Sequence, residues 1–405
     1  MVERLVANEK VEGSTPFARS NLYETSMKIC IEGWSRINHS YSMLCRNLLL
    51  EFVNLDIDLK FKETVYANDK WNYTTNFHGF PDKKNRKILS INAPKDNDYF
   101  DITYRLSYPY NFKKSNSKKL FVFGTSEFQN IDKMFENEIP KNFSKRDDLK
   151  IITPSEWSKV GFLNSGFNSQ QVEVIPCGVD CDIFYPISSE HKNEVKKKLK
   201  IKNEDFIILN VGSMSSNKGI DYLLVAFAIL RKKYKNLKLI IKDQSNLYGT
   251  SGKDIFLKTK KGKNGHVLDE EVENDIIFIS KNMNLAALNE LFNISDCYIS
   301  PYRAEGFNLV PLEVAATGTP IIVTKGGSTD DYFREDFGLQ IESSVINSNN
   351  RNYLDPDLES LVENALLIIQ NPRKYGNENS IKFVKDNFSW KKIVEKTYNV
   401  FKKKI

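Results

Sequence analysis

Short apolar segments alternate with amphipathic segments of helical period along most of this chain, and this alternation constrains its fold more than any other feature. It is clearest in the second half, where five apolar segments of strand length stand at Phe206–Val211, Leu237–Lys242, Ile276–Ile279, Cys297–Ser300 and Pro320–Thr324. Helical patterns separate them at Ile220–Lys232, Asn284–Asn293 and Leu309–Thr317. Strands that are apolar throughout are typical of a parallel sheet covered by helices on both faces. The sequence therefore predicts an α/β fold.

The first half shows the same alternation less clearly. Strand-like segments stand at Lys28–Ile31, Ile88–Ile91, Asp101–Leu106, Leu120–Phe123, Lys150–Thr153 and Val172–Ile175. We expect one helix over Asn38–Phe52, with Asn38 or Ser40 as its N-cap, and another that begins after Ser155. Two doubly wound, Rossmann-like domains follow from the two halves. Since ligands bind at the carboxyl ends of parallel strands, we expect two such edges to face each other across a deep cleft.

Two stretches of the chain carry no clear pattern. Asp56–Lys87 is polar and aromatic, and Gln244–Asn274 reads as a polar insertion. The highly charged stretch Ser188–Lys202 predicts a linker with a short helix. We therefore expect an N-terminal domain over residues 27–187, a C-terminal domain over 188–380, and closing helices over 381–405.

Residues 1–26 do not read as the start of a domain. Gly13-Ser14-Thr15-Pro16 lies in polar sequence without periodicity, and the first convincing strand follows Met27. The segment VEGSTPFARS looks like the translated end of a bacterial transfer-RNA gene. Our hypothesis is that the natural chain starts at Met27; a mature N-terminus sequenced as Val2 would refute it.

Composition excludes several classes of protein. Apolar residues make up 40% and charged residues 27% of the 405 residues, as in ordinary globular proteins. No apolar run approaches the roughly 18–20 residues that a membrane-spanning helix needs. Since the N-terminus also lacks the order of a signal peptide, we expect a cytoplasmic protein. The odd count of five scattered cysteines argues against a disulfide framework, and no second pair or histidine completes a metal site with Cys177 and Cys181.

The formal charge of +6 comes largely from lysine-rich clusters such as Lys196–Lys202 and Lys402–Lys404. Such clusters are typical of a solvated surface. A second interpretation is peripheral attraction to an anionic membrane face or to a phosphorylated substrate. No helix-turn-helix, zinc-finger or RNA-binding signature is present, so nucleic acid is not an expected partner.

The segment from Ala304 to Glu313 carries the strongest chemical signal. Two glutamates, Glu305 and Glu313, are separated by seven residues, the first in a loop after a strand and the second on the following helix. Gly306 allows close approach of backbone to a ligand. Free N–H groups at the helix start, over Phe307–Leu309, suit a phosphate. Glu313 can accept hydrogen bonds from two ribose hydroxyls. Taken alone, two acidic residues in the first turns of a helix also describe an ordinary helix start.

This segment resembles the EGFG-type element with two spaced glutamates of the family 4 glycosyltransferases. Other matching pieces are ITPSEWSKVGFLNSGF, VEVIPCGVDCDIFYP, LNVGSMSSNKGIDYLLVAF and FVKDNFSW. The resemblance covers nearly all of residues 27–405. It implies a GT-B fold whose last helix packs back on the N-terminal domain, and a retaining transferase that needs no cofactor or metal. Its substrates would be a nucleotide sugar, held by the C-terminal domain, and a glycan or lipid-linked acceptor.

The resemblance also implies roles for single residues. Glu313 would hold the ribose, and Glu305 would lie against the donor sugar. Phe307, Asn308 and Leu309 would offer backbone groups to the donor, and Lys218 would contact its phosphates and stabilise the leaving diphosphate as a metal does elsewhere.

The sequence departs from the family pattern in three places. Ser213 stands where the family usually has an arginine. The N-terminal glycine pair that meets the diphosphate is reduced to Gly33-Trp34. The usual His-Gly at a strand end is replaced by Phe123-Gly124. These departures resemble a subgroup with NHSY, FGTSE and NKGI elements.

Three residues are candidates to replace what is missing. His39 and Glu127 could each steady the acceptor hydroxyl or the sugar, although each also suits a structural role at a helix start. Arg105 could supply the phosphate cation.

The sequence thus predicts a glycosyltransferase that moves a hexose-type sugar from a nucleotide-sugar donor, with domain closure that excludes water. Three alternatives stay open: a related epimerase, a phosphorylase, and a catalytically silent protein that binds sugar nucleotides or glycans. No lysine motif suited to pyridoxal phosphate supports a phosphorylase. Fold alone does not decide among them.

Overall fold

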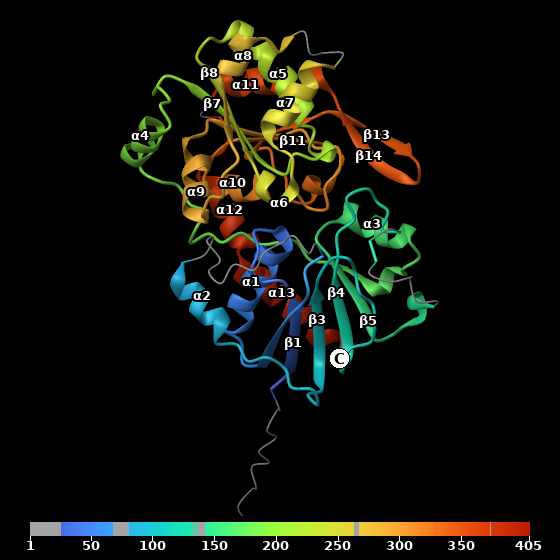
Figure 1. Ribbon diagram of the computed structural model, residues 1–405. Helices are drawn as coiled ribbons and strands as arrows, with labels where there is room; N and C mark the ends of the chain where they lie inside the picture. The colour runs from blue at the N-terminus through green and yellow to red at the C-terminus, as the bar shows by residue number, and fades with distance from the viewer. Residues whose placement is uncertain (1–25, 68–80, 133, 136–141, 263–266, 373) are drawn as a thin grey trace, which may run out of the picture.

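The computed structural model describes residues 26–67, 81–132, 134–135, 142–262, 267–372 and 374–405. Its described elements form two parallel six-stranded sheets, one from each half of the chain, and a separate two-stranded hairpin. Figure 1 shows the second sheet and its helices above the first. The predicted α/β fold with two doubly wound units is confirmed. The division of the chain at residue 188 and the hypothesis about residues 1–26, nearly all outside the described residues, stay predictions.

The first sheet has the strand order β2-β1-β3-β4-β5-β6. Its strands are β1 (Lys28–Gly33), β2 (Asp58–Glu63), β3 (Phe100–Leu106), β4 (Ser117–Phe123), β5 (Leu149–Thr153) and β6 (Val172–Val174). The helices beside it are α1 (Ser40–Phe52), α2 (Asp82–Leu89) and α3 (Glu156–Asn164). Ser155 caps α3 as predicted, since its hydroxyl accepts the N–H of Ser158 at 3.0 Å.

The second sheet has the strand order β12-β11-β10-β7-β8-β9. Its strands are β7 (Phe206–Gly212), β8 (Leu237–Asp243), β9 (Ile276–Ile279), β10 (Cys297–Ser300), β11 (Ile321–Thr324) and β12 (Gly338–Ile341). The helices associated with it are α4 (Ser189–Lys198), α5 (Ile220–Lys233), α6 (Ser245–Tyr248), α7 (Gly252–Lys260), α8 (Glu270–Asn274), α9 (Leu285–Ile294), α10 (Leu309–Ala315) and α11 (Leu358–Gln370). Buried side chains cover both faces of β8, which explains its apolar sequence.

A hairpin of β13 (Ser343–Ser348) and β14 (Arg351–Pro356) follows β12. Ser348 pairs with Arg351, so the turn has only two residues, Asn349 and Asn350, and both have positive φ, of 53° and 58°. Asparagine tolerates this conformation, and turns of this kind match the twist of the strands they join. The sequence reading did not identify this hairpin.

The last two helices return across both halves. The helices α12 (Glu378–Phe388) and α13 (Trp390–Lys404) meet at Ser389, as predicted from Phe388-Ser389-Trp390. Phe401 of α13 packs against Phe52, Tyr104 and Phe121, at ring-centroid distances of 6.0, 5.5 and 4.6 Å. The expectation that the last helix packs back on the N-terminal half is therefore confirmed.

Some local expectations were wrong. The strand predicted at Ile88–Ile91 does not form, because Ile88 and Leu89 close α2, where only Ile88 is buried. The predicted insertion Gln244–Asn274 contains α6, α7 and α8, and Asp56–Lys87 contributes β2 and part of α2. The N-cap of α1 is His39, not Asn38 or Ser40: its Nδ1 accepts the N–H of Tyr41 at 3.1 Å.

Candidate active site

The carboxyl edges of the two sheets face each other and are joined by direct contacts. The Ser155 hydroxyl, just after β5, donates to the carbonyl oxygen of Gly306 at 2.7 Å. The N–H of Glu156 donates to the Asp331 carboxylate at 2.7 Å. A side chain at Gly306 would meet the Cβ of Thr125 at 2.6 Å. Gly306 therefore allows the close approach of the other half of the protein, in addition to any approach by a ligand.

Three charged side chains gather at this junction. Lys218, after β7, forms an ion pair with Glu305, after β10, and Glu305 is only 5% exposed. Glu127, after β4 of the first sheet, accepts a hydrogen bond at 3.1 Å from Asn217, the neighbour of Lys218. The structure thus brings Lys218, Glu305 and Glu127 together, as a site made from both halves requires.

Local geometry fixes the position of Lys218. Gly219 has φ of +66°, and a Cβ there would meet the carbonyl oxygen of Pro301 at 1.8 Å, so only glycine fits the turn that follows Lys218. Asn217 is 8% exposed, and its carbonyl oxygen accepts the N–H groups of Arg303 and Ala304 at 2.7 and 3.3 Å. The loops after β7 and β10 are therefore held together beside the cluster.

Electrostatics within the cluster shift two pKa values. Burial, with the charge of Glu305, raises the pKa of Glu127 to about 7, although Lys218 opposes the shift. Burial alone would lower the pKa of Lys218, but Glu305 and Glu127 outweigh it and hold that pKa above its ordinary value. At neutral pH the cluster therefore contains a firmly charged lysine and a carboxyl group that changes its protonation easily.

The predicted donor loop is closely packed. Phe307 is buried against Tyr332, with ring centroids 5.2 Å apart. Asn308 has φ of 61° and donates to the Ser300 hydroxyl at 3.0 Å, so its side chain does not cap α10. Leu309 begins α10, which ends at Ala315 and is shorter than the predicted helix Leu309–Thr317. The conformation leaves backbone N–H groups at the start of α10 without a side-chain cap.

Glu313 lies one turn into α10 and is partly buried. Burial, with a smaller contribution from Asp180, raises the pKa of Glu313 to about 8. Asp180 itself is paired with Lys84. No hydrogen bond or ion pair of Glu313 is found among the described residues, so its carboxyl group is available to a polar ligand.

His39 combines a structural position with a place at the cleft. Besides capping α1, its ring lies 5.2 Å from that of Trp34 and 6.2 Å from that of Tyr248, which belongs to α6 of the second half. Burial lowers the pKa of His39 to about 4, so the imidazole is neutral at pH 7. With Nδ1 accepting a hydrogen bond, the proton of the neutral ring lies on Nε2.

Gly33 and Ser213, which stand where the family pattern has donor-binding residues, have structural contacts of their own. Gly33 ends β1, where a Cβ would meet the Sγ of Cys45 and the carbonyl oxygen of Leu106, both at 2.9 Å. The Ser213 hydroxyl shares a hydrogen bond of 3.0 Å with that of Ser215. Neither residue has a feature that points to phosphate in this structure.

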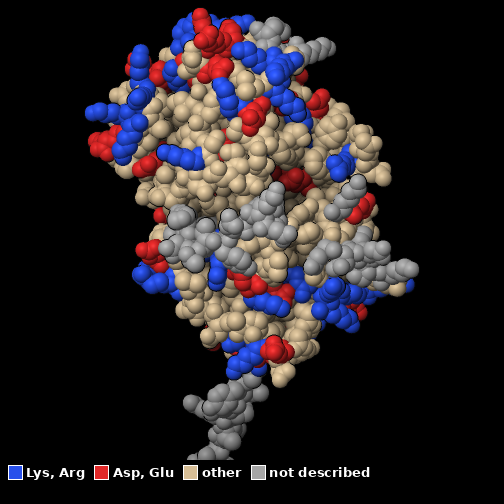
Figure 2. Space-filling model, viewed as in Figure 1, with Lys and Arg blue, Asp and Glu red and all other residues tan. Residues whose placement is uncertain are grey.

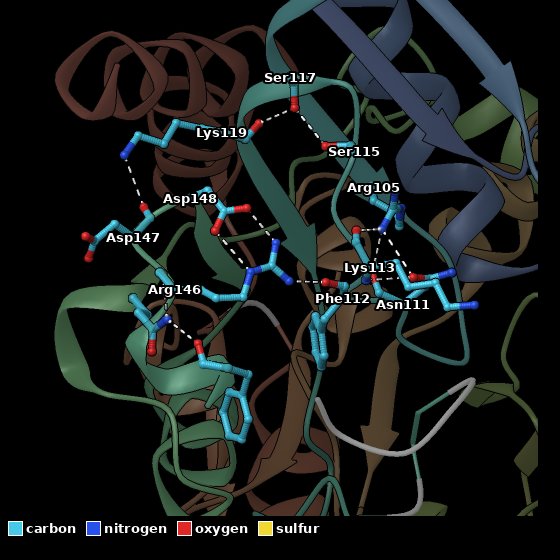
Figure 3. A network of polar contacts seen from close by, with 12 residues as sticks. Arg105, Asn111, Phe112, Lys113, Ser115, Ser117, Lys119, Arg146, Asp147 and Asp148 are labelled. Atoms are coloured by element: carbon cyan, nitrogen blue, oxygen red, sulfur yellow. Dashed lines mark hydrogen bonds and ion pairs between the residues drawn. The ribbon is translucent and has the colours of Figure 1, made fainter. Parts of the chain in front are cut away.

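The suggestion that Arg105 supplies the missing cation is wrong. Its guanidinium group is 2.6 Å from the Glu32 carboxylate and donates to the carbonyl oxygens of Asn111 and Lys113 at 2.8 and 3.0 Å. Figure 3 shows Arg105 enclosed by this loop, in a network that continues to Phe112 and Arg146. These contacts use the guanidinium group to fix the loop after β3.

Two further polar residues at the cleft were missed by the sequence reading. Tyr248 interacts electrostatically with Lys218, Glu127 and Glu305, and burial raises its pKa to about 12. Lys242 is 5% exposed at the carboxyl end of β8, and its ammonium group donates only to the carbonyl oxygen of Asp243 among the described residues. A buried lysine without a carboxylate partner at this edge of a sheet is a candidate to bind a ligand. The sequence signal was the charged residue at the end of a largely apolar strand.

Three further findings concern metal ligands, membrane-spanning helices and surface charge. In the described part of the chain, no three His, Cys, Asp or Glu side chains lie close enough together to hold a metal ion. Among the same residues, no helix is long and apolar enough to cross a membrane. Figure 2 shows Lys and Arg largely interspersed with Asp and Glu on the visible face.

Solved structures define the class of this fold. The structure of a glycosyltransferase from Rickettsia africae matches with a TM-score of 0.65 and 17% identity, over 94% of this chain and 98% of that one. Anabaena Alr3699/HepE in complex with UDP-glucose matches with a TM-score of 0.64 and 13% identity, over 93% of this chain and all of that one. The predicted GT-B fold is therefore confirmed.

Sequence comparisons then give the family. Residues 191–383 match the family model described as "Glycosyl transferases group 1". Lipopolysaccharide 1,2-N-acetylglucosaminetransferase of Salmonella typhimurium is 26% identical over 254 residues, which are 60% of this chain and 62% of that protein. The capsular polysaccharide biosynthesis glycosyltransferase CapM of Staphylococcus aureus is 25% identical over 266 residues, 62% of each chain. The chain thus spans less than two thirds of these relatives, and its segment 191–383 is similar to the group 1 glycosyl transferases.

Proposed function

We propose that this protein is a glycosyltransferase that moves a hexose-type sugar from a nucleotide-sugar donor to a glycan or lipid-linked acceptor. The observation that carries the proposal is the cluster of Lys218, Glu305 and Glu127 at the facing sheet edges. The relatives named above are a lipopolysaccharide 1,2-N-acetylglucosaminetransferase and a capsular polysaccharide biosynthesis glycosyltransferase, and HepE forms a complex with UDP-glucose. The second half carries the family match and would hold the donor.

In the proposed reaction the bond between the sugar and the diphosphate breaks, and the diphosphate leaves with the electron pair. Lys218 lies where its ammonium group can neutralise the growing charge, which is the contribution a metal ion makes in other transferases. We therefore propose a reaction that needs no metal or other cofactor. Glu313 would accept hydrogen bonds from the ribose, because it is otherwise without a partner among the described residues.

We also propose that transfer proceeds with retention. The acceptor hydroxyl would enter from the face that the diphosphate leaves, so that the departing phosphate oxygen can take its proton. Glu127 and neutral His39, both from the first half, would steady the sugar or the acceptor. Direct contacts between the halves, such as Ser155 to Gly306, would exclude water from the reacting atoms.

The proposed location is the cytoplasm, with peripheral contact at the inner membrane face. Lysine-rich surface segments support it, since α4 carries Lys196, Lys197 and Lys198 in its last turn and α13 ends in Lys402–Lys404. Such segments suit a lipid-linked acceptor in an anionic membrane.

Donor binding tests the proposal. Thermal shifts would be measured with UDP-, GDP- and ADP-sugars in EDTA, for the wild type, Glu313→Ala and the control Glu363→Ala, which changes an exposed carboxylate on α11. A shift with one nucleotide family that is lost only in Glu313→Ala supports the donor site. No shift with any nucleotide sugar refutes it. Binding without transfer or donor hydrolysis would favour the catalytically silent alternative. That alternative is supported by Ser213, an uncharged residue where the family usually has an arginine.

A further inference from the structure

The hairpin β13–β14 contacts the first half of the protein through its turn. The N–H of Asn352 donates to the carbonyl oxygen of Phe128 at 2.9 Å, and its side-chain amide donates to Gln129 at 2.8 Å. The Asn130 side chain donates to the carbonyl oxygen of Asn350 at 3.1 Å. Arg351 lies 5.3 Å from the centre of the Phe128 ring. These partners immediately follow Glu127 in the chain.

The base of the same hairpin contacts the loops that carry the donor-side residues. The N–H of Leu354 donates to the carbonyl oxygen of Arg303 at 2.7 Å. Asp355 accepts a hydrogen bond of 2.5 Å from Tyr222, over whose ring Arg303 lies at 4.7 Å. Arg303 is two residues from Glu305, and its own N–H donates to Asn217. The hairpin is therefore attached to the loops of Glu305 and Lys218.

These contacts close a ring. It runs from the hairpin to residues 128–130, through Glu127 to Asn217, on to Arg303, and back to the hairpin at Leu354. Gln129 has a positive φ of 53°, a conformation that is strained for a residue with a side chain and persists only where its surroundings hold it. Asn352, bonded to its side chain, is one of the groups that hold it.

We propose that the β13–β14 hairpin is a strap that fixes the Glu127 loop against the donor half, and that Asn352 is a positioning residue for Glu127. Figure 1 shows the hairpin projecting from the second half toward the first. The strap follows from contacts between described residues; only the catalytic consequence of holding Glu127 rests on the proposed function. It adds to the attachments that Ser155–Gly306 and Glu156–Asp331 already give the junction.

The charge environment of Glu127 depends on this placement. Lys218 and Glu305 from the second half act on its carboxyl group, and it acts in turn on Tyr41, Tyr108 and Tyr248. If the strap is loosened, Glu127 moves away from both Glu305 and Lys218. Its electrostatic interactions with Glu305 and Lys218 then weaken together, and its pKa moves toward that of a solvent-exposed carboxyl group.

Hydrogen exchange on the ligand-free chain tests the strap without knowledge of the donor. The N–H groups of Thr125 and Ser126 are bonded to Tyr110 and Ser158 and report on the Glu127 loop. We expect Asn352→Ala to speed their exchange about tenfold. The control Val345→Thr, at an exposed site of the same hairpin, should leave it unchanged. Equal exchange in wild type and Asn352→Ala would overturn the strap.

Turnover of UDP-glucose tests the positioning role. We expect Asn352→Ala and Glu127→Gln each to lower kcat about tenfold, with KM changed less than twofold, and the double variant to resemble Glu127→Gln alone. The dependence of kcat on pH should also be shifted along the pH axis in Asn352→Ala relative to the wild type. Multiplied losses in the double variant would overturn the role of Asn352 through Glu127. Failure of the wild type to bind any nucleotide sugar would refute the proposed function, while the exchange result would still decide the strap.

Discussion

Replacing Glu313 by glutamine should stabilise the protein in a pH-dependent way. Burial raises the pKa of this carboxyl group from its ordinary 4.5 to about 8. Between these values the folded protein keeps a proton that the unfolded chain has released, so the stability of the wild type falls as pH rises through this window. At pH 7, which is 2.5 units above the ordinary pKa of 4.5, the free energy of unfolding is lowered by about 3 kcal/mol. Glu313→Gln has no proton to lose and avoids this cost.

The measurement is the free energy of unfolding in urea, for wild type and Glu313→Gln, from pH 5 to pH 8.5. The two proteins should differ by less than about 1 kcal/mol at pH 5 and by about 3 kcal/mol at pH 7, with glutamine the more stable. Glu363→Gln, at an exposed position of α11, serves as the control and should follow the wild type at every pH. Parallel curves for wild type and Glu313→Gln would refute the reasoning, because they would show that the folded protein does not hold the proton.

The same substitution should weaken donor binding while it stabilises the fold. An ionised carboxylate accepts two hydrogen bonds from a ribose, whereas the glutamine amide offers one acceptor oxygen. If ribose binding favours the ionised form of Glu313, then nucleotide affinity of the wild type should rise as pH increases toward 8 and a proton should be released on binding. Calorimetry with UDP in two buffers of different ionisation enthalpy measures that proton. Such opposition between stability and binding is typical of a binding site.

Three more substitutions test the cluster and its surroundings. Lys218→Met should lower donor turnover by about 10²–10³-fold, because the leaving group loses its stabilising charge; steady-state kinetics checks this. It should also lower the free energy of unfolding by about 3 kcal/mol, because Glu305 stays buried without its cation; urea unfolding checks this. Lys242→Met should raise stability at neutral pH, since burial lowers the pKa of Lys242, and the gain should shrink as pH approaches 10.5; melting temperatures between pH 7 and pH 10 check it. Glu127 has a pKa of about 7 in the ligand-free protein, so kcat/KM for a reaction that needs its carboxylate should fall below pH 7 in the wild type. The kcat/KM profile of Glu127→Gln should lack that step.

The second sheet was predictable because its strands are buried on both faces. Strands such as β10 and β11 consist mainly of apolar residues, so their sequence alone distinguishes them from loops. The strand β2 was missed for the opposite reason: it is an edge strand, its side chains are partly exposed, and its sequence DLKFKE is mainly charged. Periodicity thus fails at the edges of the sheets.

The site was predictable only in part. Lys218, Glu305 and Glu313 stand in short motifs, and their neighbours Gly219 and Gly306 mark turns and close approaches that the backbone needs. The role that we propose for Asn352 could not be predicted, because it depends on a contact with Gln129, 223 positions away in the sequence. The two-asparagine turn beside it was the one local signal of the hairpin. Contacts of this kind arise from the relative placement of the two halves, which no local pattern encodes.

The ion pair between Lys218 and Glu305 offers a physical account of how donor binding could change the protonation of Glu127. Without a ligand, Glu305 neutralises the lysine and satisfies a buried charge that would otherwise be costly. A diphosphate that enters beside Lys218 adds negative charge to a site that already contains Glu305 and Glu127. The site then favours protonation of Glu127, whose pKa of about 7 makes this change inexpensive. Donor binding should therefore raise the pKa of Glu127 further, and loss of the diphosphate should reverse the change. A carboxyl group that responds to the charge of the leaving group would connect the progress of bond cleavage to the acceptor side of the cleft.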